Sequence, residues 1–375
     1  MSLGGCGAIP WGPGSDVKWE GLENTRPIEC DMSLCILCII WPFFLPFSST
    51  TNIDLIMSRF GIPDLTALRG QVVVLTGGAL GIGSELVRIC AGRGAHVFFG
   101  DVLAEKGQAL EAELRKTASS DDQHIEFVRT DAADYQSNLN LFDTAYSACG
   151  RVDHAVSAAG VSERGNITDP ALTLQSVREE PTHAMTVLNI DLIGPVYFSR
   201  IASVYLRQGS QSNSSTTNGS ASHTANKSLT LVSSVAGFTE APGLTVYSTA
   251  KHGAIGLMRS LRKTLIDADQ PIRTNAICPW MTRTRLAQGM EQAWAKAQLP
   301  SNEPVDVAAV IAGVMVDSTL NGASLYVESG RAWDVEPGID DTMPIWLGEE
   351  RCAEWRKGQV VLGSGANWQN REAGS

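Results

Sequence analysis

The chain is short of basic residues. Lys and Arg together number 29 against 40 Asp and Glu, which gives a net charge of −11 at pH 7. Nucleic-acid binding needs a basic surface, and adsorption to anionic lipid needs clustered basic residues. We therefore expect no nucleic-acid partner and no electrostatic attachment to a membrane.

The most apolar segment is too short for an ordinary membrane span. Residues 32–47 read MSLCILCIIWPFFLPF and include Pro42 and Pro46. A transmembrane helix needs about twenty apolar residues, and a secretory signal needs a basic flank nearer the start. We expect residues 1–60 to form an N-terminal extension, disordered or docked on the surface. Membrane contact by residues 32–47 is the less favoured alternative. Met57 is a natural starting point for the fold, so residues 1–56 are not expected to be needed for folding or activity.

The cysteines show no metal-binding or disulfide pattern. Cys90 and Cys278 lie in apolar segments, where cysteine acts as a small buried hydrophobe. The run Cys30-x4-Cys35-x2-Cys38 has a spacing seen at iron–sulfur sites, but it lacks the polar surroundings that such a site needs. We expect no metal, and a reducing cytoplasm is the simplest compartment.

What the chain does have is a glycine turn between a strand and a helix. Residues 71–83 read QVVVLTGGALGIG, and the segment that follows, 84–90, has helical spacing. The β-branched run 72–75 predicts a buried strand. Glycines allow a tight turn and close backbone approach, and the helix N-terminus presents free N–H groups to a pyrophosphate. The segment therefore predicts a phosphate cradle.

Beyond this turn, strand-like runs alternate with helical patterns. The expected strands are 72–75, 96–100, 125–129, 155–158, 229–233, 272–278 and 324–328, and the expected helices after the first are 102–117, 137–148, 182–208, 247–267 and 305–316. Strict alternation predicts an α/β fold with a doubly wound parallel sheet of about seven strands. Helices should cover both faces, and ligands should bind at the carboxyl ends of the strands.

A hydrophilic insert interrupts this domain, which we place at residues 61–330. Residues 209–227 read GSQSNSSTTNGSASHTANK, with no apolar residue larger than alanine. Such a segment has nothing to bury, so we expect a disordered surface loop.

Three motifs carry a resemblance to a known family. The turn TGGALGIG resembles the TGxxxGxG of short-chain dehydrogenases/reductases, and Tyr247 and Lys251 match the family's YxxxK. Ser234 precedes Tyr247 by thirteen residues, the family's usual interval. The resemblance covers residues 65–330 and implies a Rossmann-type fold with hydride transfer to or from NAD or NADP.

The resemblance also implies the cofactor contacts. The expected residues are Thr76, Gly77, Gly81, Ile82, Gly83, Asp101, Asp131, Ala159, Gly160, Tyr247, Lys251, Pro279, Thr282 and Thr284. Asp101 ends the second expected strand, where a carboxylate binds a ribose 2′-hydroxyl and repels a 2′-phosphate. No Lys or Arg lies at 78–80 or 100–103, so NAD is favoured over NADP. A helix cap is the structural alternative for Asp101.

Ser234, Tyr247 and Lys251 are the expected catalytic residues. Free tyrosine has a pKa of about 10, too high for a base near neutrality. A helix places Tyr247 and Lys251 on one face, where the ammonium group would favour the phenolate. Ser234 would bond the substrate oxygen. Asp191 stands where the family has an Asn that kinks the long helix and supports a water chain to the Lys. We expect Asp191 to keep this place, with an altered pH dependence.

Apolar residues near the expected site indicate a bulky apolar substrate. They are Phe238, Leu244, Trp280 and Met281, and Trp280 stands where the family has Gly. The chain is similar to fungal members related to 15-hydroxyprostaglandin dehydrogenase. This resemblance implies NAD-dependent oxidation of a hydrophobic secondary alcohol, such as a terpenoid or polyketide, in secondary metabolism. The alternatives are an NADPH-dependent ketone reductase and a non-catalytic dinucleotide-binding relative.

The C-terminal segment is rich in tryptophan. Residues 331–375 include Trp333, Trp346, Trp355 and Trp368 and are not expected to contribute to the sheet. An arm that exposed so much apolar surface would be unfavourable. We expect residues 333–346 to wall the substrate pocket, with a subunit interface as the alternative. A homo-oligomer is expected.

Overall fold

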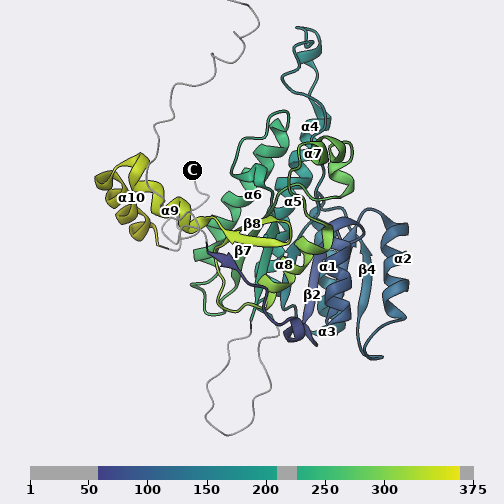
Figure 1. Ribbon diagram of the computed structural model, residues 1–375. Coiled ribbons are helices and arrows are strands. Elements are labelled where there is room, and N and C mark those ends of the chain that lie inside the picture. The colour runs from purple at the N-terminus through teal and green to yellow at the C-terminus, as the bar shows by residue number, and fades with distance from the viewer. Residues whose placement is uncertain (1–57, 209–225, 364–375) are drawn as a thin grey trace, which may run out of the picture. The chain divides into compact units, whose positions relative to one another are not determined.

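The computed structural model describes residues 58–208 and 226–363 (Figure 1). These residues build one nine-stranded sheet with the order β1-β9-β8-β7-β6-β5-β2-β3-β4. The seven parallel strands are β2 (Val72–Thr76), β3 (His96–Asp101), β4 (Ile125–Arg129), β5 (His154–Ser157), β6 (Ser228–Val232), β7 (Arg273–Pro279) and β8 (Ser324–Glu328). The predicted doubly wound parallel sheet is confirmed.

Two short antiparallel strands extend the predicted sheet. β9 (Arg331–Asp334) pairs with β8, and β1 (Arg59–Phe60) pairs with β9. The sequence analysis placed both segments outside the sheet, in the N-terminal extension and the C-terminal arm, and both expectations are wrong. Strands of two and four residues carry too little periodicity to be seen in the sequence, and their pairing depends on the exposed edge of β8.

The chain reverses its direction of travel across the sheet beside β2. From β2 it proceeds outward through β3 and β4, and it then returns to β5 on the other side of β2. In such sheets, ligands bind beyond the carboxyl ends of the strands at this switch point. The glycine turn follows β2 directly, so the fold brings it to the expected place.

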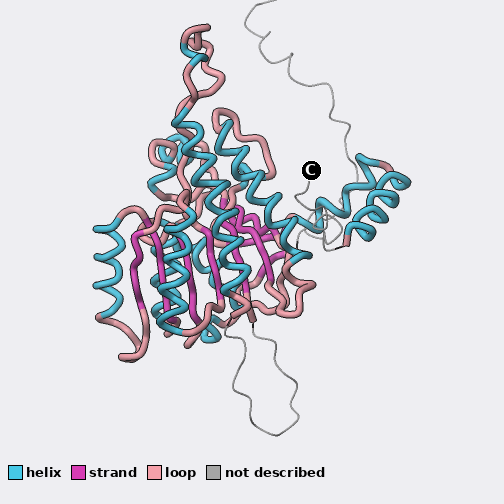
Figure 2. Tube along the Cα trace, turned by 180° about the vertical axis from the view of Figure 1, so that it is seen from behind, coloured by secondary structure: helices cyan, strands magenta, loops and turns pink. Residues whose placement is uncertain are grey.

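Helices cover both faces of the sheet, as Figures 1 and 2 show. One face carries α1 (Gly81–Gly92), α2 (Ala104–Arg115) and α8 (Pro304–Val316). The other carries α3 (Tyr135–Cys149), α5 (Gly194–Tyr205) and α6 (Thr245–Thr264). Successive β2 residues face opposite layers: Val73 and Leu75 pack with α1 and α8, and Val72 and Val74 pack with α3. Because both layers are apolar, the central strands are continuous hydrophobic runs.

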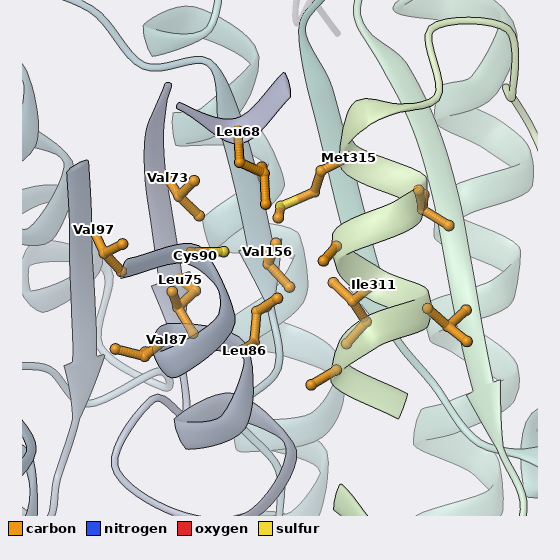
Figure 3. Close-up of a cluster of buried hydrophobic side chains, with 14 of the residues drawn as sticks. Leu68, Val73, Leu75, Leu86, Val87, Cys90, Val97, Val156, Ile311 and Met315 are labelled. Carbon is orange, nitrogen blue, oxygen red and sulfur yellow. The ribbon is translucent and has the colours of Figure 1, made fainter. Parts of the chain in front are cut away.

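The layer of α1 and α8 is closely packed. Leu86 and Cys90 of α1 meet Ile311 and Met315 of α8 above the strands (Figure 3). Cys90 and Cys278 are both fully buried, as predicted. Burial raises the pKa of the Cys90 thiol to about 12, so it remains a neutral thiol.

The predicted helix 182–208 is interrupted. It consists of α4 (Thr182–Leu188), a π-helical turn (Asn189–Ile193) and α5. In the described part of the chain, this is the one stretch long and apolar enough to cross a membrane by length and composition. Asp191 in its π-helical turn is nevertheless fully buried within the fold, as expected for a helix of the protein core.

The hydrophilic insert ends earlier than expected. Residues 209–225 lie outside the described residues, but Lys227, predicted to bury nothing, is only 5% exposed. Its Nζ donates to Val152 O at 2.6 Å and lies 2.8 Å from Asp153 Oδ1. Burial opposes the charge of Asp153, but Lys227 and the amide of Val72 outweigh it and lower the pKa of Asp153. A charged side chain can be buried when the folded protein provides an oppositely charged partner for it.

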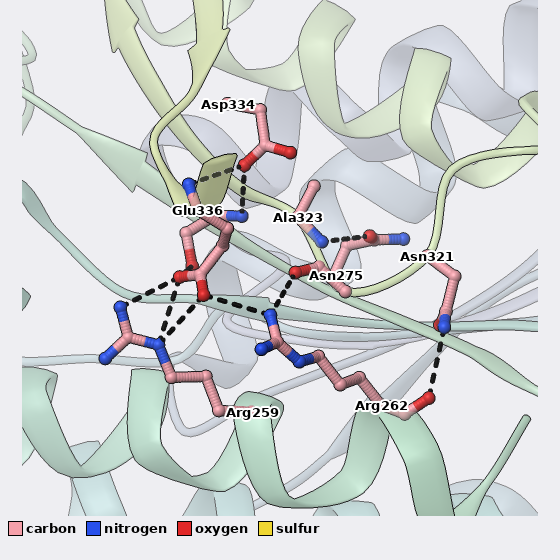
Figure 4. A network of polar contacts seen from close by, with 9 residues as sticks. Arg259, Arg262, Asn275, Asn321, Ala323, Asp334 and Glu336 are labelled. Carbon is pink, nitrogen blue, oxygen red and sulfur yellow. Dashed lines mark hydrogen bonds and ion pairs between the residues drawn. The ribbon is translucent and has the colours of Figure 1, made fainter. Parts of the chain in front are cut away.

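The C-terminal segment is fixed by a buried glutamate. Glu336 begins α9 (Glu336–Leu347), which precedes α10 (Glu349–Leu362). Its carboxylate accepts hydrogen bonds from Arg259 and Arg262 of α6 and from the Ser324 hydroxyl (Figure 4). Burial disfavours the charge, but these partners outweigh it and lower the pKa of Glu336.

The remaining short elements are one-turn 3-10 helices at Leu65–Leu68, Ser176–Arg178, Val235–Gly237 and Arg285–Ala287, and the helix α7 (Glu291–Lys296).

A buried histidine predicts how stability depends on pH. His154 in β5 is 1% exposed and shares a hydrogen bond of 2.8 Å with the Ser228 hydroxyl. Burial lowers its pKa from 6.5 to about 3. Between these values the unfolded chain binds a proton that the native chain does not, so stability falls as the pH drops through this window.

We expect the stability advantage of the wild type over His154→Gln to shrink below pH 6.5 by about 1.4 kcal/mol per pH unit. Urea unfolding at several pH values measures it, with the exposed His183→Gln as control. A pH-independent difference would contradict a neutral buried His154.

Candidate active site

The glycine turn after β2 is shaped by close backbone contacts. Gly77 has φ = +73°, and a Cβ there would lie 2.6 Å from Ala159 N. A Cβ on Gly83 would lie 2.0 Å from Gly77 O. Leu80, which precedes α1, has no side-chain group to cap the helix. The first-turn N–H groups of α1 are therefore available to an anion, and the turn fits a dinucleotide pyrophosphate.

The loop after β7 closes on this turn. A Cβ on Gly81 would lie 3.3 Å from Thr284 Cγ2. Gly81 and Thr284 are about 200 positions apart in the sequence and are both expected to contact the cofactor, and the fold makes them neighbours. Pro279 ends β7, and the buried Thr282 donates to Trp280 O at 2.9 Å. The structure thus brings both predicted cofactor segments to one edge of the sheet.

Asp101 holds the turn before α2 and also supports the glycine turn. Its Oδ1 accepts from Leu103 N at 3.0 Å, and its Oδ2 accepts from Ala79 N at 3.1 Å. Because α2 begins at Ala104 and its N-cap residue Leu103 has no side-chain cap, the helix cap offered as an alternative for Asp101 is wrong. The Asp101 carboxylate lies beside the glycine turn instead. Asp131, after β4, is exposed and accepts from Ala133 N.

Lys251 is the centre of the expected catalytic group. Its Nζ lies 3.0 Å from Asp191 Oδ2, 3.3 Å from Val232 O and 5.4 Å from the centre of the Tyr247 ring. Burial opposes the ammonium charge, but Asp191 and Tyr247 outweigh it and raise the pKa of Lys251. The lysine is therefore a buried, permanent cation next to the tyrosine.

Asp191 reaches Lys251 because of the π-helical turn. The turn carries its fully buried side chain inward, where Oδ1 accepts from Val161 N at 2.9 Å. Asn189, two residues earlier, is exposed. In the family, the Asn at this position supports a water chain to the Lys; here the Asp191 carboxylate lies in direct ion-pair contact with Lys251.

Ser234 lies where β6 ends, immediately before the 3-10 turn Val235–Gly237. Its Oγ accepts from Ala236 N at 3.2 Å. The neighbouring Ser233 donates to Lys251 O at 2.8 Å, and a Cβ on Gly237 would lie 2.7 Å from the same carbonyl. These contacts hold the Ser234 segment against α6, the helix of Tyr247 and Lys251.

Trp280 belongs to an aromatic cluster. Its ring lies 5.4 Å from Trp294 and 6.2 Å from Tyr326, and Tyr326 lies 5.9 Å from Trp333. Among described residues other than glycine, positive φ occurs at Gln298 and Ser329. Trp280 therefore replaces the family's glycine without a left-handed backbone.

The other expected pocket residues, Phe238, Leu244 and Met281, are half-buried. Of the C-terminal tryptophans expected at the pocket, Trp333 lies in the aromatic cluster, whereas Trp346 is 67% exposed. The prediction that residues up to 346 dock on the pocket is wrong for Trp346.

The sequence analysis missed Glu163. Its Oε2 accepts from Tyr247 N at 2.7 Å and its Oε1 from Val246 N at 3.3 Å, at the start of α6. A separation of 84 residues leaves no local signal.

One group of side chains outside this site has metal-ligand chemistry. His96, His124 and Cys149 have ligand atoms within 4.8 Å of one another. However, His96 Nδ1 accepts from His124 N, so the neutral ring carries its proton on Nε2. Neither nitrogen of His96 then has a free lone pair for a metal ion, which disfavours a metal site.

Comparisons with known proteins agree with this geometry. The profile of the short chain dehydrogenase family matches residues 71–295. A short-chain dehydrogenase/reductase (ascJ) of Acremonium egyptiacum is 31% identical over 74% of this chain and 84% of its own. The 5′-hydroxyaverantin dehydrogenase of Dothistroma septosporum is 29% identical over 76% of this chain and 92% of its own. The protein belongs to the short-chain dehydrogenase/reductase family and is an oxidoreductase.

A solved structure shows the same fold. A short-chain dehydrogenase of Burkholderia cenocepacia in complex with NADP superposes with a TM-score of 0.56 at 25% identity, covering 70% of this chain and 98% of that one.

The Lys251–Asp191 pair predicts a coupled effect on stability. Lys251→Met leaves a buried carboxylate without its cation, which should cost about 3–5 kcal/mol. Lys251→Met/Asp191→Asn removes both charges and should recover most of that loss. Urea unfolding of the single and double variants measures the coupling, with the exposed Lys263→Met of the same helix as control. Equal stabilities for the single and double variants would show that the pair is not coupled.

Proposed function

We propose that the protein is an NAD-dependent dehydrogenase that oxidises a hydrophobic secondary alcohol to a ketone. The observation that carries this proposal is the buried Lys251 beside Tyr247, at the sheet edge where the glycine turn and Ser234 also lie. A buried cation next to a phenol favours the phenolate, which can act as a base.

The roles of the side chains follow from this geometry. Tyr247 takes the proton of the substrate hydroxyl, and Ser234 forms a hydrogen bond with the same oxygen and orients it. Lys251 stabilises the tyrosinate, while Asp191 keeps Lys251 charged and in place. The nicotinamide, when bound, supplies the hydride acceptor. In the reverse direction Tyr247 returns the proton to the ketone oxygen.

Asp101 supports NAD as the cofactor. A carboxylate at the end of β3 can accept from a ribose hydroxyl and repels a 2′-phosphate. The register of the sheet, however, places Arg129 of β4 opposite Asp101, and an arginine there could pair with a phosphate. This register, together with the NADP complex of the similar structure, favours an NADPH-dependent ketone reductase as the second candidate.

The aromatic cluster around Trp280 supports a bulky apolar substrate. Similarity to 5′-hydroxyaverantin dehydrogenase supports a role in fungal secondary metabolism, with a polyketide or terpenoid alcohol as the substrate class. A non-catalytic role is disfavoured because Tyr247 lies beside Lys251 and the segment of Ser234 is held against the same helix through Ser233 and Gly237.

We further propose a cytoplasmic homo-oligomer whose subunits meet through the C-terminal helices. Ile345, Trp346 and Val360 of α9 and α10 are 82%, 67% and 81% exposed. Large apolar side chains with this degree of exposure support an interface with another subunit. Residues 1–56 are proposed to be dispensable, since β1 begins only at Arg59.

Removal of the proposed base tests the catalytic role. Tyr247→Phe keeps the ring but loses the phenolic oxygen, so kcat should fall by about 10²–10⁴-fold, while NAD affinity changes little. Steady-state kinetics and NAD titration measure the two quantities, with Tyr197→Phe in α5 as control. A variant that retains more than a few per cent of wild-type activity would exclude Tyr247 as the base.

Cofactor choice is tested at Asp101 and Arg129. Asp101→Ala should weaken NAD binding and improve the relative affinity for NADP, because the ribose acceptor and the repulsive charge are lost together. Asp101→Ala/Arg129→Ala should lose this gain if Arg129 supplies the phosphate partner. Titration with both dinucleotides decides the matter, and an unchanged NAD/NADP affinity ratio in Asp101→Ala would refute the assignment.

A further inference from the structure

The catalytic helix begins without a cap of its own. α6 starts at Thr245, and the preceding Leu244 has no polar side-chain atom. Ser248 N bonds Leu244 O at 2.8 Å, so the first intrahelical hydrogen bond starts one residue after Tyr247. The backbone N–H of Tyr247 therefore belongs to the first turn, where helices have no internal partner for their donors.

Glu163 supplies the missing acceptors from a distant loop. Its two carboxylate oxygens accept from Tyr247 N at 2.7 Å and from Val246 N at 3.3 Å. An anion at a helix N-terminus is favoured by the helix dipole, and its hydrogen bonds are charge-assisted. The shorter of these bonds holds the backbone of the proposed catalytic base itself.

The same loop also contacts the rest of the catalytic group. A Cβ on Gly160 would lie 3.4 Å from Lys251 Nζ and 3.2 Å from Asp191 Oδ2. Val161 N donates to Asp191 Oδ1, and the Val161 side chain packs in one apolar cluster with Tyr247. Four consecutive residues, 160–163, thus connect Asp191 and Lys251 to the start of α6.

We propose that Glu163 is a positioning residue for the hydride-transfer site, holding the first turn of α6 so that Tyr247 keeps its place beside Lys251. The expected effect on kcat rests on the proposed function, whereas the expected effect on the first turn of α6 rests on the hydrogen bonds alone. Its loss frays the first turn and moves Tyr247 relative to the substrate, without touching the glycine turn that binds the cofactor.

The test compares Glu163→Ala and Glu163→Gln in the full chain, with Glu180→Ala as control. Glu180 is exposed and lies in the same β5–α4 connection. Glu163→Ala should lower kcat about ten- to a hundredfold, because a displacement of about 1 Å at a reacting group can cost about 10²-fold. KM for NAD should stay within about twofold, since the glycine turn is intact. Glu163→Gln keeps an acceptor for Tyr247 N and should recover most of the lost kcat.

Amide hydrogen exchange provides a readout that needs no turnover. The Val246 and Tyr247 amides should exchange faster in Glu163→Ala, while the β2 amides keep their protection. If the wild type turns over no alcohol, the proposed function fails, and the exchange result still shows whether Glu163 caps α6. Unchanged exchange at Val246 and Tyr247, wild-type kcat in Glu163→Ala, or a folded Glu163→Gln as slow as Glu163→Ala would each overturn the role of Glu163.

Discussion

The ion pair between Lys251 and Asp191 is the interaction on which the site depends. Neither charge could be buried alone, because the cost of desolvation would exceed what the fold can supply. Together they stand 3.0 Å apart and almost fully buried, with Val232 O and Val161 N as further partners. The pair therefore fixes α6, the π-helical turn, the end of β6 and the loop after β5 relative to one another.

Helix α6 connects this pair to the C-terminal segment. Its first half carries Tyr247 and Lys251, and its second half carries Arg259 and Arg262, which hold Glu336 at the start of α9. The strand β9 that precedes Glu336 carries Trp333 into the aromatic cluster of Tyr326 and Trp280. One helix thus places the proposed base and also anchors the segment that contributes Trp333 to the aromatic cluster of Trp280.

Much of this arrangement could be predicted from the sequence because its signals are local. The strand–glycine–helix unit at 71–90 and the alternation that follows depend on neighbouring residues, and the seven parallel strands were found with small errors at their ends. Trp280 and Asp191 could be identified as departures, but the effect of each depends on the fold. Trp280 keeps an ordinary backbone, and Asp191 touches Lys251 directly.

What could not be predicted depends on partners far away in the sequence. Lys227 reads as part of a hydrophilic loop until Asp153, 74 residues earlier, provides its counter-charge. Glu163 resembles any loop glutamate until α6 presents its free N–H groups. The short strand β9 forms because the edge of β8 offers unpaired backbone groups, and β1 forms on the edge of β9 in turn, which no pattern within two to four residues reveals.

We propose that this edge of the sheet transfers a hydride between a secondary alcohol and NAD. The most direct measurement is the rate of NADH formation at 340 nm by the full chain with hydrophobic secondary alcohols, compared with the same alcohols deuterated at the carbinol carbon. We expect NADH formation and a slower rate with the deuterated alcohols under single-turnover conditions. Binding of NAD without reduction of NAD or NADP by any such alcohol would contradict it.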